Sequence, residues 1–231
     1  MEPIKVAVYL YPGADALDFT GPIEIFSTPS PSSGPPPFEV TTFAHHSPVA
    51  TATPALVCIP NATFAATAAR IQDYDVLVIP GAYAEAITAL TDTAEGNELV
   101  ALLQQFAATP PRSATRKRVL QSVCSGSVLV AASGILPNRR VTTHHWAFDM
   151  LRAAADKAAG GQSNLHLVQD ARWVDSGLTD AGVRIVNAAG VSSGIDASLW
   201  VVGHLAGEAQ RSWAAETAEF EPRDAAWRAG A

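Results

Sequence analysis

The stretch Ser122-Val123-Cys124-Ser125-Gly126-Ser127 decides the fold. Residues 118–121 before it form a short β-rich segment, and an apolar run over residues 128–133 follows it. This order predicts a strand, a sharp turn at Cys124 and a helix. Such a nucleophile elbow holds one reactive side chain above a sheet on a strained backbone. Small neighbours such as Ser125 and Gly126 suit a turn that leaves no room for bulk.

The predicted helix start indicates that Cys124 is a reactive thiol. A helix N-terminus supplies free N–H groups and a partial positive charge, which favour a thiolate over a thiol. The hexapeptide fits a second interpretation equally well, because a buried free cysteine packs as a small hydrophobe. The rest of the chain has to decide between them.

Composition indicates one globular domain over residues 1–231. The chain is 48% hydrophobic and 16% charged, with a formal net charge of −7. We expect a core over about residues 4–218 and a loosely held tail after Phe220. The four cations of residues 112–118 are predicted to form a solvated loop before a strand, so nucleic-acid binding is not expected.

The N-terminus and the cysteines indicate a cytoplasmic protein. The first ten residues alternate like a strand and lack a signal-peptide cleavage site, and no stretch is long enough to span a membrane. Cys58 and Cys124 are too few for a disulfide framework or a zinc site, and the histidines and acids show no metal-ligand spacing. Cys58 lies in an apolar run and is predicted to be a core residue.

Strands that alternate with helices predict a parallel sheet covered on both faces. The expected strands are residues 4–10, 38–43, 75–79, 118–121, 166–169, 171–175 and 183–187, with a hairpin or edge strand at 51–60. The expected helices are residues 23–27, 84–90, 95–107, 128–133, 147–159, 195–206 and 208–218. Pro22 is placed in the first turn of the first helix, since proline is common there. Residues 28–37, rich in Pro and Ser, are predicted to be an exposed connection.

Three chemistry-bearing segments follow strands of this sheet. Asp18, the turn Pro80-Gly81-Ala82 and Cys124 come after the first, third and fourth main strands. Reactive sites in such sheets lie at the carboxyl ends of the strands. The three segments are therefore expected to converge on one edge.

Four stretches of the sequence resemble the ThiJ/PfpI superfamily, within the class I glutamine amidotransferase-like fold. They are Leu17-Asp18-Phe19-Thr20-Gly21-Pro22, Val78-Ile79-Pro80-Gly81, the hexapeptide around Cys124, and Thr142-Thr143-His144 together with Gly190-Val191-Ser192-Ser193-Gly194-Ile195-Asp196. The resemblance implies a flavodoxin-like three-layer sandwich with a mostly parallel central sheet. The branch that the chain resembles most contains the isonitrile hydratases and the amidotransferase-like domains of AraC-type regulators. Those regulators carry an additional C-terminal helix-turn-helix domain, for which this chain is expected to have no room.

The resemblance implies roles for two residues. Cys124 would be the nucleophile, and Asp18 the carboxylate that hydrogen-bonds the thiol and supplies a proton. Asp18 as a mere helix-start cap is the alternative. The glyoxalase-like and protease-like branches instead place a glutamate near the cysteine and use a histidine; here Glu24 is expected to face elsewhere.

The sequence departs from the superfamily pattern at two places. Ala82 stands where a second glycine is usual after Pro80-Gly81. This difference is expected to alter the backbone N–H donors near the thiol. An extra histidine in Thr142-Thr143-His144-His145-Trp146 leaves open whether His144 or His145 takes the family position. Both histidines are predicted to be structural, with a general-base role as the alternative.

The remaining candidates surround the nucleophile. Ser125 is expected to offer its N–H to developing charge and its hydroxyl to substrate, or simply to cap the helix. Gly81 and Ala82 offer backbone N–H groups, or are plain turn residues. Thr20 and Gly21 are predicted to shape the pocket wall.

Four further residues are assigned structural roles. Three tryptophans are expected to serve as packing or interface residues: Trp146, Trp173 and Trp200. Asp196 is expected to cap or steady its helix near the pocket.

The leading hypothesis is a cofactor-free hydro-lyase that converts isonitriles to N-substituted formamides. One alternative is a cofactor-free glyoxalase or deglycase acting on 2-oxoaldehydes. Another is a non-catalytic ligand or redox sensor related to regulator domains. A homodimer and a small-molecule substrate are expected, without nucleic acid or membrane partners.

Overall fold

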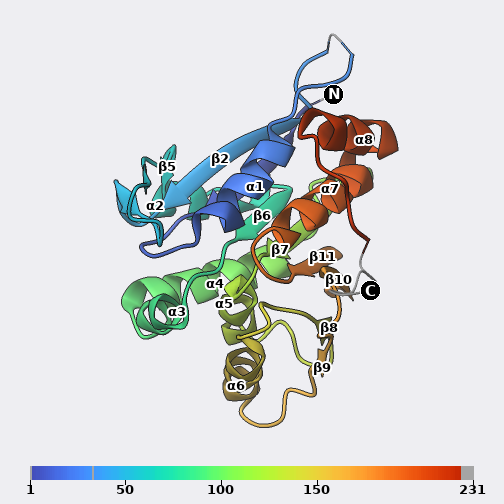
Figure 1. Ribbon diagram of the computed structural model, residues 1–231. Helices are drawn as coiled ribbons and strands as arrows, with labels where there is room; N and C mark the ends of the chain where they lie inside the picture. The colour runs from blue at the N-terminus through green and yellow to red at the C-terminus, as the bar shows by residue number, and fades with distance from the viewer. Residues whose placement is uncertain (1, 33, 225–231) are drawn as a thin grey trace.

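The computed structural model describes residues 2–32 and 34–224. Its centre is a seven-stranded sheet (Figure 1). In spatial order the strands are β10 (Trp173–Leu178), β11 (Val183–Ala188), β7 (Arg118–Ser122), β6 (Val76–Ile79), β1 (Ile4–Tyr9), β2 (Phe38–Ala44) and β5 (Ala62–Thr63). All neighbours are parallel except β10, which is antiparallel to β11. The mostly parallel sheet of the flavodoxin-like sandwich is thus confirmed.

Helices cover both faces of the sheet, as Figure 1 shows. One layer contains α1 (Ala16–Phe26), α7 (Ser193–Ala206) and α8 (Glu208–Thr217); the other contains α3 (Ala84–Thr91), α4 (Ala94–Ala108), α5 (Gly126–Ala132) and α6 (Phe148–Ala159). A short helix α2 (Phe64–Ala68) and a 3-10 turn (Ile71–Asp73), neither predicted, precede β6. None of the helices in the described part of the chain combines the length and hydropathy that a bilayer crossing requires.

Two small strand pairs lie outside the main sheet. β3 (Val49–Ala50) and β4 (Val57–Cys58) form an antiparallel pair, and β8 (Arg140–Val141) lies parallel to β9 (His166–Leu167). The prediction of a hairpin is therefore confirmed, but its strands span residues 49–58 and not 51–60. The prediction that Cys58 is a core residue is wrong, because β4 packs at the margin and leaves the thiol half-buried.

The first helix begins earlier than predicted. It starts at Ala16 and not near Ile23, because the carboxylate of Asp15 caps it by accepting the N–H of Leu17 at 3.0 Å. Pro22 therefore lies inside the helix, where its missing N–H leaves the carbonyl of Asp18 without the usual partner. The correction matters for the site, because Asp18 lies in the first turn of α1 and on its buried face.

The basic segment of residues 112–118 is not simply a solvated loop. Arg118 belongs to β7 and is fully buried, and its guanidinium lies 4.0 Å above the centre of the Phe106 ring. Burial lowers the pKa of Arg118 to about 10. Arg112 pairs with the buried carboxylate of Asp75 at 2.9 Å. These cations stabilise the sheet end opposite the elbow instead of forming a free basic patch.

The three tryptophans with predicted roles divide into two groups. Trp173 and Trp200 pack against each other with ring centres 4.9 Å apart, which confirms their structural role. Trp146 is 77% exposed, so it does not serve as a packing residue within this chain.

Of the two roles predicted for Asp196, capping α7 is wrong, because Ser192 holds the N-cap position, and steadying the helix remains. Asp196 is buried and pairs with Arg172 at 2.6 Å, and its other oxygen accepts the N–H of Arg223 at 2.7 Å. Phe220 packs against the core. In the tail predicted to be loose after Phe220, residues 221–224 are described and Arg223 makes the bond to Asp196, whereas residues 225–231 lie outside the described residues.

Candidate active site

Cys124 forms the predicted elbow between β7 and α5. Its φ of 57° lies in the left-handed region, which costs a non-glycine residue about 1–3 kcal/mol. Surrounding hydrogen bonds hold this conformation. The N–H of Cys124 donates to the carbonyl of Ala189 at 2.8 Å. The carbonyl of Cys124 accepts the hydroxyls of Thr143 at 3.0 Å and Ser127 at 3.1 Å.

Asp18 brings a carboxyl group from α1 to the elbow. It is fully buried, and its Oδ2 accepts the N–H of Gly81 at 2.9 Å. Burial, and next the negative charge of Asp15, raise the pKa of Asp18 to about 7. The hydrogen bond from the N–H of Gly81 and the nearby Cys124 thiol act in the opposite direction. The segments after β1, β6 and β7 therefore do converge, and Asp18 is near the midpoint of its titration at neutral pH.

The sulfur of Cys124 is a thiol in the free protein. Burial, and next the charge of Asp18, raise the pKa of Cys124 to about 12. Hydrogen bonds from the N–H groups of Ser125 and Val191 oppose this rise without overcoming it. The expectation that the helix start favours a thiolate is thus wrong for the resting site, because burial next to a carboxylate outweighs it. The thiol loses its proton only when another group accepts it.

The backbone donors after β6 are already occupied. The N–H of Gly81 serves Asp18, and the N–H of Ala82 donates to Oγ of Ser125 at 2.9 Å. The Ser125 hydroxyl in turn donates to the carbonyl of Ala82 at 2.6 Å. The two hydrogen bonds between Ala82 and Ser125 hold the turn after β6 against the elbow. The N–H groups that act on the sulfur are instead those of Ser125 and Val191.

Val191 is a site residue that the sequence interpretation missed. Its φ of 38° is an outlier for a β-branched side chain, and it precedes α7 at the cavity wall. The strained turn directs its N–H to Cys124. The only signal in the sequence is its place in the motif Gly190–Asp196, which does not reveal a positive φ.

The structure distinguishes the two histidines. His144 lines the cavity, whereas His145 is exposed. Nδ1 of His144 accepts the N–H of Trp146 at 3.3 Å, so the neutral ring carries its proton on Nε2. Burial, and next His145, lower the pKa of His144. His144 is not among the groups that shift the pKa of Cys124.

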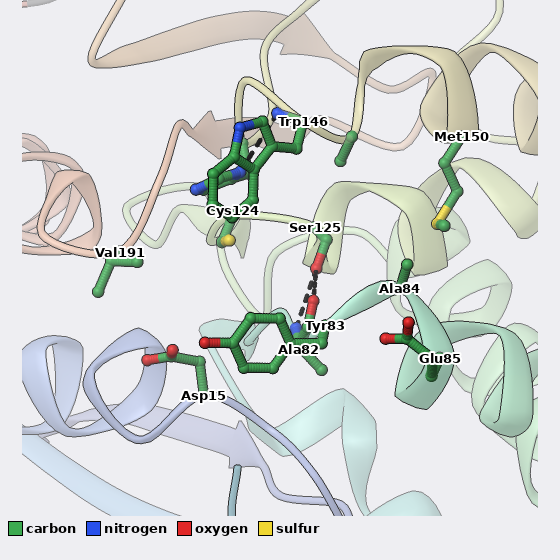
Figure 2. A pocket seen from close by; sticks show the side chains of 12 residues that line it. Asp15, Ala82, Tyr83, Ala84, Glu85, Cys124, Ser125, Trp146, Met150 and Val191 are labelled. Carbon is green, nitrogen blue, oxygen red and sulfur yellow. Dashed lines mark hydrogen bonds between the residues drawn. The ribbon is translucent and has the colours of Figure 1, made fainter. Parts of the chain in front are cut away.

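The elbow opens into a cavity of about 390 Å³, shown in Figure 2. Its wall comes from the end of β6, the starts of α1, α3 and α7, and the loop into α6. It is lined by Asp15, Ala82, Tyr83, Ala84, Glu85, Cys124, Ser125, His144, Trp146, Ala147, Met150 and Val191.

Several predicted site residues lie outside this lining. Thr20 is exposed, and its hydroxyl donates to the carbonyl of Ala16 at 2.7 Å. Gly21 packs α1 against α7, where a Cβ would lie 3.0 Å from Cγ1 of Ile195. Asp18 and Gly81 are buried behind the wall.

Other lining residues gave no sequence signal of a site. Asp15 reads as a loop residue before its helix, and Glu85 and Met150 lie on helix faces whose orientation depends on packing. Tyr83 directly follows the Pro80-Gly81-Ala82 turn, and that proximity is a signal that could have found it.

Asp15→Asn tests the electrostatic coupling in the site. Asparagine keeps the cap of α1 but removes a charge that raises the pKa of both Asp18 and Cys124. We expect alkylation of Cys124 by iodoacetamide at pH 8 to become about two- to tenfold faster, since one pKa unit changes the thiolate fraction tenfold. The rate is followed by mass spectrometry in a Cys58→Ser background. An unchanged rate would show that the charge of Asp15 does not reach the thiol.

Comparisons with known proteins show the family and the fold. The family model described as DJ-1/PfpI family matches residues 4–189. An uncharacterised protein in the cpoL 5′ region of Streptomyces lividans is 32% identical over 142 residues, which are 62% of this chain and 88% of that protein. Among solved structures, a ThiJ/PfpI family protein from Pseudomonas syringae has a TM-score of 0.70 at 26% identity, covering 100% of this chain and 80% of that one.

DJ-1beta of Drosophila melanogaster has a TM-score of 0.69 at 16% identity, covering 95% of this chain and 99% of that one, a likeness of fold alone. The family match spans the sheet from β1 to β11 and includes Asp18 and Cys124. The chain belongs to the DJ-1/PfpI family.

Proposed function

We propose that this protein is a cysteine-dependent hydro-lyase that hydrates an isonitrile to an N-substituted formamide. One observation carries the proposal: the Cys124 thiol and the buried carboxyl of Asp18 are close enough for each to shift the pKa of the other, and the pKa of Asp18 is about 7. A carboxyl with such a pKa both accepts and returns a proton at physiological pH. The pair therefore supplies a nucleophile and a proton donor without a histidine.

The first step suits the isonitrile carbon, which has a lone pair and accepts a nucleophile and a proton at the same atom. The sulfur of Cys124 bonds to this carbon, and the thiol proton passes through Asp18 to the same carbon. The product is a thioimidate, R–N=CH–S–Cys124. The thiol thus needs no stable thiolate, because its proton leaves in the same step as the bond forms.

The second step hydrolyses the thioimidate and regenerates the free Cys124 thiol. Water adds to the thioimidate carbon, with one of its protons going to the nitrogen and its oxygen retained as a hydroxyl. The carbon–sulfur bond then breaks, the hydroxyl proton returns through Asp18 to the sulfur of Cys124, and R–NH–CHO is released. The N–H groups of Ser125 and Val191 stabilise negative charge on the departing sulfur. None of these steps calls for a metal or an organic cofactor.

The alternative reactions have less support from the site. A glyoxalase or deglycase of the histidine-dependent kind needs a base that takes the thiol proton, and His144 does not act on the pKa of Cys124. A non-catalytic sensor would need no proton donor, yet a carboxyl is buried against the thiol. The homodimer expected from the resemblance stays a prediction, which light scattering can check.

Formation of a formamide tests the proposal directly. The protein is incubated with phenyl isonitrile at pH 7, and N-phenylformamide is measured by chromatography. We expect multiple turnovers, and a mass increase on Cys124 equal to one isonitrile when the reaction is quenched early. Turnover of methylglyoxal without formamide would favour the glyoxalase, and turnover of neither substrate would favour the sensor.

A further inference from the structure

Two aromatic side chains at the cavity are exposed, although large aromatic residues are usually buried. Trp146 is 77% exposed and Tyr83 63% exposed, and both line the cavity. The indole of Trp146 is braced by edge contacts with the rings of His144 and His145, at 4.9 and 4.8 Å between centres. The backbone of Tyr83 occupies the N-cap position of α3, and its ring lies at the cavity. Two exposed aromatic rings at the cavity are therefore available to a ligand.

The ionisable side chains of the wall make the cavity negative. Asp15 and Glu85 both line it, and Figure 2 shows them on opposite sides of the Tyr83 ring in this view. The charge of Asp15 acts as far as the Cys124 thiol, whose pKa it raises. His144 is neutral because burial lowers its pKa. Among the described residues, none that lines this cavity is lysine or arginine.

From this combination we infer that the cavity selects a positively charged substrate. Aromatic faces attract ammonium groups through their electron-rich π-systems, and two carboxylates add Coulomb attraction. The apolar lining of Ala84, Ala147 and Met150 suits a hydrocarbon body between the cation and the reacting carbon. The substrate class is thus an isonitrile that carries a cationic group. The reacting group rests on the proposed function, whereas the charge preference rests on the cavity alone.

Three para-substituted substrates test the preference, of which the cationic and the neutral one have nearly equal shape. They are phenyl isonitriles with a para trimethylammonium, tert-butyl or carboxylate group. We expect kcat/KM to be about tenfold higher for the cation than for the neutral compound, and lowest for the anion. The preference should shrink as salt screens the charges. Equal kcat/KM for all three, or a preference for the anion, would overturn the inference.

Charge-removing variants locate the origin of the preference. Glu85→Gln and Asp15→Asn should each lower the ratio of kcat/KM for cation over neutral substrate about threefold. Glu24→Gln is the matched control, because it removes one charge from the exposed face of α1, outside the cavity lining. It should leave the ratio unchanged. An equal drop in all three variants would assign the preference to the overall negative charge and refute a cavity effect.

Binding of unreactive ions separates this inference from the proposed reaction. Calorimetry with the wild-type protein compares phenyltrimethylammonium with benzoate. Tighter binding of the cation, weakened in Glu85→Gln, supports the inference even if no isonitrile is turned over. Turnover of the neutral isonitrile without any cation preference in rate or binding would refute the inference and leave the proposed function intact.

Discussion

Asp18→Asn is expected to slow formamide production by about 10²–10⁴-fold, the usual contribution of a positioned proton donor. Asparagine has nearly the shape of aspartate, and its carbonyl oxygen can still accept the N–H of Gly81, which now donates to Oδ2 of Asp18 at 2.9 Å. It cannot relay the thiol proton to the isonitrile carbon. The loss is measured as kcat for phenyl isonitrile, with Cys124→Ala as the reference for complete inactivation. Full turnover by Asp18→Asn would refute the proton relay.

The same substitution is expected to stabilise the fold above pH 7. The pKa of Asp18 is raised from 3.8 to about 7 in the folded protein, so its stabilising contribution is full below pH 3.8 and is lost as pH rises through about 7. At pH 8 an ionised carboxylate is buried, and removing that charge should raise the free energy of unfolding by about 2–4 kcal/mol. At pH 4 the gain should nearly vanish.

Urea denaturation at pH 4 and pH 8 measures this difference. Asp73→Asn is the control, because Asp73 is a half-buried aspartate that pairs with Arg70 at the far side of β6. It should give no stabilisation that grows with pH. Equal effects of Asp18→Asn at both pH values would show that Asp18 is already ionised at low pH and does not hold a proton near neutrality.

Sequence patterns predicted the reactive edge because local signals and topology point to the same place there. Small residues around Cys124 indicate a tight turn, and the turn Pro80-Gly81 follows a run of residues typical of a buried strand. Parallel strands carry their ends to one edge, so Asp18 could be placed there from its position after β1. The wrong helix start did not disturb this, since α1 also begins at that edge.

Other features of the site depend on contacts between distant segments. The N–H groups of Gly81 and Ala82 looked free in the sequence, but Asp18 and the Ser125 hydroxyl occupy them. The thiol state of Cys124 depends on burial, which residue types alone do not reveal. A strained turn, an exposed aromatic wall or a buried cation such as that of Arg118 likewise follows only from the folded packing.

Gly126→Ala is expected to lower the free energy of unfolding by about 3 kcal/mol or more, because no space exists for a methyl group. A Cβ at this position would lie 2.3 Å from the carbonyl oxygen of Ile79, and 2.8 Å from that of Pro80. Both are backbone atoms at the end of β6, so no side-chain rotation relieves the clash. The start of α5 would have to move away from β6, and Cys124 would move away from Asp18 with it.

The direction of this effect distinguishes packing from helix propensity. Gly126 is the first residue of α5, and alanine in a helix is ordinarily favoured over glycine by about 1 kcal/mol. Gly161→Ala is the matched control, because a Cβ there meets nothing within 4 Å and its φ is not positive. Urea denaturation should show the large loss only for Gly126→Ala. A stable Gly126→Ala protein with unchanged turnover would mean that the elbow tolerates a wider separation from β6, and that the spacing of Cys124 and Asp18 does not depend on this contact.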